Sequence, residues 1–129
     1  MQETIVAKSL PLTSFAAGKV VTTETSNTMA DGMATRIPDE EAVAVIRKGA
    51  SRIVQVSDAE VAAAIRAYWT DTHNLAEGAG AAGLAAAMQE KARLAGKRVG
   101  LILSGGNIDF DLFRNWVGTE VTAGQRAVA

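Results

Sequence analysis

The pattern of apolar and polar positions divides the chain into short runs and longer blocks. Short runs rich in β-branched and other apolar residues predict strands at 4–7, 19–23, 52–56 and 99–103. Blocks with apolar residues three or four positions apart predict helices at 9–17, 38–48, 58–72 and 80–94, and a short one after residue 107. Strands that alternate with helices indicate an α/β class, an open and mostly parallel sheet flanked by helices.

Capping residues support two of these helices. Ser57 and Glu60 have the S-x-x-E spacing of a capping box at the start of helix 58–72. Asn107 or Asp109 can cap the last helix through a side-chain oxygen. These signals place helix starts more sharply than the apolar pattern alone.

The most apolar run, residues 99–103, ends abruptly in Ser104, Gly105 and Gly106. Such a run predicts a strand buried on both faces, as in a parallel sheet. The two glycines let the backbone turn tightly and approach a bound group, because neither carries a side chain. A strand, a glycine turn and a helix start form the usual ligand crevice of an open α/β sheet, and the Ser104 hydroxyl would point into it.

Composition narrows the class of protein further. The 129 residues suit one domain, with 48% hydrophobic residues and a net charge of −1. A near-neutral chain lacks the excess of positive charge that binds nucleic acid or an anionic membrane. No run approaches the ~18–20 apolar residues of a membrane span. Without cysteine the chain fits a reducing cytoplasm, where we expect it. A single histidine, His73, argues against a metal site.

Two further stretches could carry chemistry, although each has an ordinary structural interpretation. Glu77 stands where helix 80–94 begins, and a carboxylate there is stabilised by free backbone N–H groups. Asp31 and Gly32 form a turn signal. Tyr68 and Trp69 lie at helical spacing with the apolar residues of helix 58–72, so we interpret them as core, with a binding role as the weaker alternative.

Taken together and in order, these stretches resemble one known family. The segments NTMADGMATR, RIVQVSDAEV and DTHNLAEGAGAAGLAAAMQEKARLAGKRVGLILSGGNID are similar to the carboxyl-terminal part of the serine/threonine dehydratases. These are fold-type II pyridoxal-phosphate enzymes, with a tryptophan synthase β-like large domain, and are related to serine racemase. The resemblance runs from about Asn27 to Asp109, and more loosely back to Ser14.

The resemblance implies a cofactor-binding role for four residues. Ser104 matches the family serine that hydrogen-bonds the pyridine nitrogen of pyridoxal phosphate, and Gly105 matches the turn that lets the ring fit. Glu77 matches a glutamate near the ring, and Gly32 matches a glycine whose backbone lies beside the cofactor. A hydroxyl cannot keep the ring nitrogen firmly protonated, which fits elimination or racemisation better than transamination.

Other family features have no match in this chain. The Schiff-base lysine, the glycine-rich phosphate loop and the asparagine at the ring hydroxyl are absent, and the acidic cation ligands are not carried over. We therefore expect no catalytic residue, no metal ligand and no activity from the chain alone. In the complete enzyme it would belong to a threonine/serine dehydratase, an ammonia-lyase that converts a small amino acid to a 2-oxo acid. The alternative is a small-anion-binding or interaction domain that kept the fold.

The same comparison predicts the organisation of the chain. Residues 1–129 would be a single domain, the carboxyl-terminal fragment of a larger dehydratase-like fold, with 118–129 as a flexible tail. Strand 99–103 needs a neighbouring strand on each edge. Helix 80–94 is rich in alanine and has no polar face wide enough to be exposed to solvent. We therefore expect the chain not to be a monomer, and to pair with its missing amino-terminal half or to self-associate.

Overall fold

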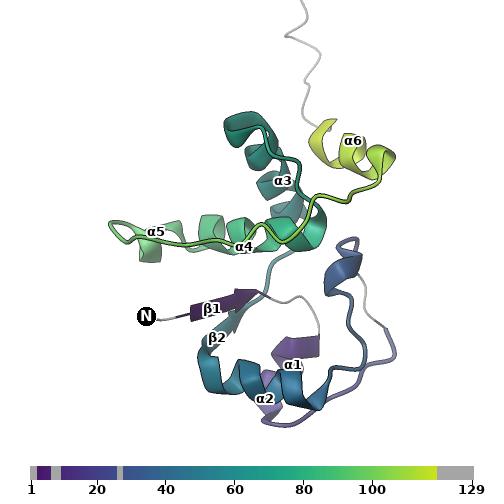
Figure 1. Cartoon of the computed structure of the whole chain (residues 1–129), viewed down its shortest axis with the longest axis vertical. Coiled ribbons are helices and arrows are strands. Elements are labelled where there is room, and N and C mark those ends of the chain that lie inside the picture. The colour runs from purple at the N-terminus through teal and green to yellow at the C-terminus, as the bar shows by residue number, and fades with distance from the viewer. Residues whose placement is uncertain (1–2, 7–9, 26–27, 119–129) are drawn as a thin grey trace, which may run out of the picture.

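The computed structural model describes residues 3–6, 10–25 and 28–118, and Figure 1 shows their arrangement. The elements described are β1 (Glu3–Val6), α1 (Leu10–Ala17), the 3-10 turn η1 (Asp31–Met33), α2 (Glu40–Gly49), β2 (Ala50–Val54), α3 (Asp58–Thr72), α4 (Gly78–Gln89), α5 (Lys91–Leu94) and α6 (Phe110–Gly118). Helices α1 and α2 lie on one side of the strands, and α4 lies on the other (Figure 1). The predicted tail lies outside the described residues except for Gly118, which ends α6.

Strands β1 and β2 pair in parallel, which confirms the predicted direction of the sheet. The Cα partners run from Glu3 with Ala50 to Val6 with Val54, with one irregularity after Glu3. Parallel neighbours need a crossover connection, and the chain supplies one through α1 and α2. The strand predicted at 52–56 therefore exists, but it begins and ends two residues earlier.

Helix α3 has the bounds that its sequence predicts, because its first turn is closed by side chains. The Ser57 hydroxyl accepts from the Glu60 N–H at 3.2 Å, and the Glu60 carboxylate accepts from the Ser57 N–H at 2.7 Å. This reciprocal pair is the predicted capping box. Asp109 caps α6 in a similar way, because its carboxylate accepts from Asp111 N–H at 2.9 Å.

Protonation of Glu60 is expected to weaken the fold. The hydrogen bond from the Ser57 backbone, followed by those from the Gln89 and Ser57 side chains, holds the pKa of the Glu60 carboxyl below its usual value. A lowered pKa contributes stability above the unfolded-state pKa, and that stability is lost as the pH falls through the folded-state pKa. In Glu60→Gln, the free energy of unfolding in urea should fall less between about pH 5 and pH 3 than in the wild type. Identical slopes in the two proteins would contradict this expectation.

The helix predicted at 80–94 is two helices with a break at Glu90. Glu90 has φ −101° and ψ 18°, and its carboxylate is held by the Arg52 guanidinium of β2. This contact lowers the pKa of Glu90 and raises that of Arg52. The sequence pattern missed the break because the partner lies 38 residues away.

Helix α4 is better covered than its composition predicts. Four of its alanines, at positions 81, 82, 85 and 86, are buried, and the helix packs against α3. The expectation that no part of this alanine-rich helix is covered within the chain is therefore wrong for that face. The core that α4 shares with α3 and α6 includes Val61 and Ile65, and Trp116 closes it. Tyr68 is partly buried against this core, as the core interpretation expects. Trp69 packs edge-on against Phe113, with ring centroids 5.3 Å apart, but it is 46% exposed, so the core interpretation is wrong for Trp69.

Residues 19–23 do not form the predicted strand. The Val21 N–H donates to the Ser14 hydroxyl at 3.0 Å and not to a neighbouring strand. Ser14, although polar, is fully buried. The hydroxyl of α1 therefore takes the place of a ladder partner and leaves this segment as a loop.

Residues 99–103 do not form the predicted strand. We call residues 98–103 the edge segment. It runs beside α4 (Figure 1), yet its backbone makes no hydrogen bond within the described part of the chain. Val99, Leu101 and Ile102 are 47%, 41% and 84% exposed, so the segment is not buried on both faces. A strand exists only with a neighbour, and β1 and β2 pair with each other.

No helix among residues 3–6, 10–25 and 28–118 has the length and apolar character that crossing a bilayer requires.

Candidate functional site

Three stretches that are far apart in the sequence meet at the first turn of α4. The Glu77 N–H donates to the Gly105 carbonyl at 3.0 Å, which ties the turn after the edge segment to the start of this helix. On another side, a Cβ placed on Gly32 would lie 3.0 Å from the Ala79 Cβ. The three stretches selected from the sequence, around residues 32, 77 and 105, are therefore neighbours in space.

The turn at Gly105 and Gly106 leaves no room for side chains. A Cβ on Gly105 would overlap the Glu77 carboxylate, and one on Gly106 would lie 2.6 Å from the Leu75 carbonyl oxygen. A Cβ on Gly80, in the first turn of α4, would lie 2.5 Å from the Gly105 carbonyl oxygen. The atoms that Gly80 and Gly106 approach belong to the backbone and cannot turn away, so this close approach requires glycine at both positions. The Glu77 carboxylate beside Gly105 ends a flexible side chain, so the overlap there is less restrictive.

Glu77 occupies the N-cap position of α4, as predicted, but its side chain does not cap the helix. The carboxylate lies against Gly105 instead. The sequence correctly placed Glu77 at the start of the helix. The expected hydrogen bond between its carboxylate and a free N–H group of the first turn is absent. The consequence is that Glu77 directs its negative charge toward the glycine turn.

Ser104 is exposed at the end of the edge segment, directly before Gly105. Its hydroxyl has no hydrogen-bond partner among the residues that the structure describes. A hydroxyl is a donor and an acceptor at once, so Ser104 can bind a nitrogen or an oxygen presented from outside the chain.

A polar link positions the Gly32 stretch, and sequence reasoning missed it. The Thr28 hydroxyl donates to the Asp58 carboxylate at 2.9 Å and accepts from the Ala30 N–H at 3.1 Å. Ala30 is buried against Gly78, where a Cβ would lie 2.8 Å from the Ala30 Cβ. Asp58 begins α3, so this link attaches the loop to the helix that packs beside α4. The sequence signal, a threonine two residues before an alanine, is too common to have been recognised.

The described lysines are not placed to act at the Ser104 turn. Lys91 follows the far end of α4, whose 12 residues span about 18 Å from Glu77. Lys97 lies before the edge segment, seven residues ahead of Ser104. Lys19 and Lys48 belong to the α1 and α2 side of the strands (Figure 1), and Lys8 lies outside the described residues. No group of three or more His, Asp or Glu side chains among the described residues could hold a metal ion.

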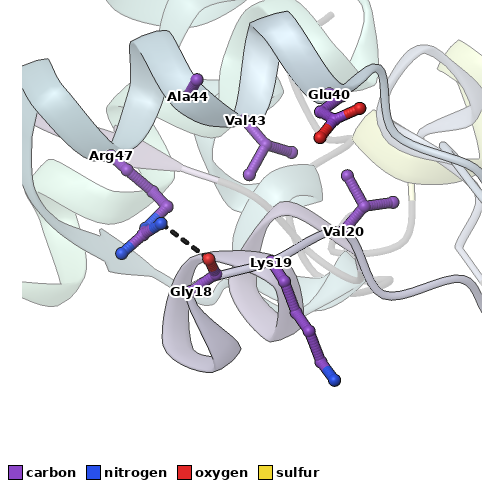
Figure 2. A pocket seen from close by; sticks show the side chains of 7 residues that line it. All are labelled: Gly18, Lys19, Val20, Glu40, Val43, Ala44 and Arg47. Atoms are coloured by element: carbon purple, nitrogen blue, oxygen red, sulfur yellow. Dashed lines mark hydrogen bonds between the residues drawn. The ribbon is translucent and has the colours of Figure 1, made fainter.

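A shallow pocket of about 190 Å³ lies elsewhere, between α2 and the residues that follow α1. Figure 2 shows that Arg47 turns toward the Gly18 carbonyl, to which it donates at 2.6 Å, while Lys19 points away from Arg47. The two cations do not converge, and this pocket is separate from the Ser104 crevice to which the small-anion-binding alternative belongs. Gly18 has φ 71° where α1 ends, as the sequence predicts.

Comparison with known proteins gives consistent results. The family model described as "Pyridoxal-phosphate dependent enzyme" matches residues 4–105. An L-threonine ammonia-lyase from Geobacter sulfurreducens is 42% identical over 93 residues, which cover 71% of this chain and 23% of that protein. A serine racemase from Schizosaccharomyces pombe is 32% identical over 104 residues, which cover 81% of this chain and 32% of that protein.

A solved structure agrees with these sequence relatives. The T.th. threonine deaminase superposes with a TM-score of 0.77 and 33% identity, covering 84% of this chain and 41% of that one. The chain spans about a third or less of the curated relatives it matches.

Proposed function

The chain belongs to the pyridoxal-phosphate dependent enzyme family, and we propose that it is the carboxyl-terminal part of a threonine or serine dehydratase, in which it supplies the cofactor wall around the ring nitrogen. One observation carries this proposal: the turn after Ser104, the start of α4 at Glu77 and the Gly32 loop meet at one place. In sequence, the first two of these stretches are 27 residues apart.

The residues present suit one side of a flat ring. The Ser104 hydroxyl is exposed and has no partner in the described part of the chain, so it is free to bond a ring nitrogen. Gly105 and Gly106 hold this turn against Glu77 and Leu75 at the start of α4, which fixes the place of the neighbouring Ser104. Glu77 adds a carboxylate beside that turn. The residues do not supply a covalent anchor, because no described lysine stands beside Ser104.

The chemistry of the site follows from the Ser104 hydroxyl. When bound, pyridoxal phosphate supplies an electron sink for negative charge at the substrate α-carbon. The Ser104 hydroxyl would donate a hydrogen bond to the ring nitrogen, and it would be too weak an acid to leave its proton there. Because the proton would stay on Ser104, the ring would withdraw electrons only moderately, which suits loss of a β-hydroxyl group. Glu77 positions the turn through its backbone N–H, which donates to the Gly105 carbonyl.

The proposed reaction of the complete enzyme is the elimination of water from serine or threonine. The α-proton and the β-hydroxyl leave, and hydrolysis of the resulting enamine gives a 2-oxo acid and ammonia. The relatives named threonine ammonia-lyase and threonine deaminase support this class. The α-proton acceptor and the lysine would come from the remainder of the family fold, which has no counterpart in this chain.

The isolated chain is expected to be inactive, and a chimera is expected to be active. Purified chain with pyridoxal phosphate and L-threonine or L-serine should release no 2-oxo acid. A chimera in which this chain replaces the matching part of the T.th. threonine deaminase should release 2-oxo acid, because that protein supplies the other residues.

Release of 2-oxo acid by the isolated chain at the rate of the deaminase would contradict the proposal. A folded chimera that shows the visible absorbance of bound cofactor and still lacks activity would contradict it equally. The unmodified deaminase is the reference for both measurements.

A further inference from the structure

Two of the three stretches that meet at α4 are joined by a hydrogen bond, whereas the third is held there by packing. The Glu77 N–H donates to the Gly105 carbonyl at 3.0 Å. The third stretch, the Gly32 loop (residues 28–34), forms no hydrogen bond with α4 within the described part of the chain. It touches the helix through small groups, since a Cβ on Gly32 would lie 3.0 Å from the Ala79 Cβ. The place of this loop on α4 therefore depends on an attachment elsewhere.

The Gly32 loop is bonded within itself. The Met33 N–H donates to the Ala30 carbonyl at 2.9 Å, and the Ala34 N–H donates to the Asp31 carbonyl at 2.8 Å. The Gly32 N–H donates to the Asp31 carboxylate at 2.8 Å. These bonds fix the shape of the loop but not its place, so the loop moves as one body when its attachment is lost.

Thr28 attaches this body to α3. Its hydroxyl donates to the Asp58 carboxylate at 2.9 Å and accepts from the Ala30 N–H at 3.1 Å, so a single group bonds the helix and the loop together. A hydrogen bond to a carboxylate is stronger than one between neutral groups. Asp58 is the first residue of α3, directly after the capping residue Ser57, so its carboxylate stands on a fixed helix end.

The attachment reaches the Ser104 turn through the start of α4. Ala30 is 2% exposed, and a Cβ on Gly78 would lie 2.8 Å from the Ala30 Cβ. Gly78 follows Glu77, whose N–H bonds the turn after Ser104. A shift of the loop therefore acts on the same helix end that holds this turn.

We propose that Thr28 and Asp58 are positioning residues for the cofactor, because their link holds the Gly32 loop and the Ser104 turn in the arrangement that binds pyridoxal phosphate. The inference rests on the proposed function, in which both stretches line the cofactor site. The Thr28 hydroxyl has its donor and an acceptor engaged within the chain, so it acts through the loop. Without the link the binding arrangement is populated only part of the time, and the apparent affinity for the cofactor falls by that fraction.

Thr28→Val tests the link, because valine keeps the branched shape and lacks the hydroxyl. In the chimera with the T.th. threonine deaminase, Thr28→Val should weaken the affinity for pyridoxal phosphate by about three- to tenfold, the factor that one lost hydrogen bond accounts for. Titration of the cofactor-free chimera, followed by the visible absorbance of bound cofactor, measures this affinity. Thr28→Ser keeps the hydroxyl and should bind the cofactor as the unsubstituted chimera does.

Asp58→Ala removes the other partner of the same bond. It should also weaken the affinity for pyridoxal phosphate. Adding Thr28→Val to Asp58→Ala should then cost little more, because the bond between the two residues is already broken.

Asp39→Ala is the control for a loss of stability alone. The Asp39 carboxylate caps α2 by accepting from the Ala42 N–H at 2.9 Å, and α2 lies on the opposite side of the strands from α4 (Figure 1). This variant should unfold at a lower urea concentration and keep its affinity for the cofactor. Hydrogen exchange of the cofactor-free chimera adds a second readout, in which the Ala30 amide should exchange faster in Thr28→Val than in Asp39→Ala or Thr28→Ser.

Several results would overturn the positioning role and leave the proposed function in place. They are unchanged cofactor affinity or unchanged Ala30 exchange in Thr28→Val, equal losses in Thr28→Val and Thr28→Ser, an equal loss in Asp39→Ala, and fully additive losses in Thr28→Val and Asp58→Ala. A folded chimera without substitutions that binds no pyridoxal phosphate would instead contradict the proposed function, and this inference with it.

Discussion

Gly80→Ala is expected to destabilise the fold by about 1–3 kcal/mol, the usual cost of adding volume where nothing can yield. The new Cβ would lie 2.5 Å from the Gly105 carbonyl oxygen and 3.1 Å from the Gly105 nitrogen. Both are backbone atoms, so the neighbouring turn must move as a whole. The movement would separate Gly105 from Glu77 and weaken the hydrogen bond between them. Urea unfolding followed by circular dichroism measures the loss.

Gly83→Ala is the control on the same helix. At Gly83 the nearest described atoms lie 4.0 Å from the new Cβ, which is ordinary contact. Alanine is the better helix former, so this variant should be neutral or more stable by up to about 1 kcal/mol. Equal effects at the two glycines would show that helix propensity, and not the approach of the Gly105 turn, decides the outcome.

Ser104→Ala in the active chimera is expected to lower turnover by about ten- to a hundredfold. A hydrogen bond to a charge-bearing group contributes about 1.5–3 kcal/mol, and each 1.4 kcal/mol is a factor of about ten in rate. The Ser104 side chain is exposed and has no partner within the described chain, so its removal should change the free energy of unfolding by less than about 1 kcal/mol. Initial rates of 2-oxo acid formation and urea unfolding give the two readouts.

Ser57→Ala serves as the opposite case. Its hydroxyl caps α3, so the variant should lose about 1 kcal/mol of stability and keep its turnover. Unchanged turnover in Ser104→Ala would remove this serine from the proposed cofactor wall. A stability loss in Ser104→Ala as large as that in Ser57→Ala would assign it a structural role instead.

Local signals predicted much of the fold. The bounds of α3 follow from the capping box at Ser57 and from apolar spacing, because both act within one helix. The end of α1 at Gly18 follows from the freedom of glycine to adopt positive φ. Turn and helix-start signals selected the three stretches that meet at α4, and their order carried the resemblance to the dehydratases, whose wider pyridoxal-phosphate family the match confirms. These signals did not reveal the link from Thr28 to Asp58, since these residues are 30 positions apart.

The sequence by itself determined the bounds of α3, the caps at Ser57 and Asp109, the parallel direction of the sheet and the family, because these depend on neighbouring residues or on motifs in fixed order. The tertiary structure alone decided the break at Glu90, the contact of Glu77 with Gly105 and the absence of a strand at residues 99–103. An ion pair, a close backbone approach and a strand each require a partner that is distant in sequence. For the edge segment that partner is not among the described residues, so an apolar run that predicts a buried strand remains extended, unpaired and exposed.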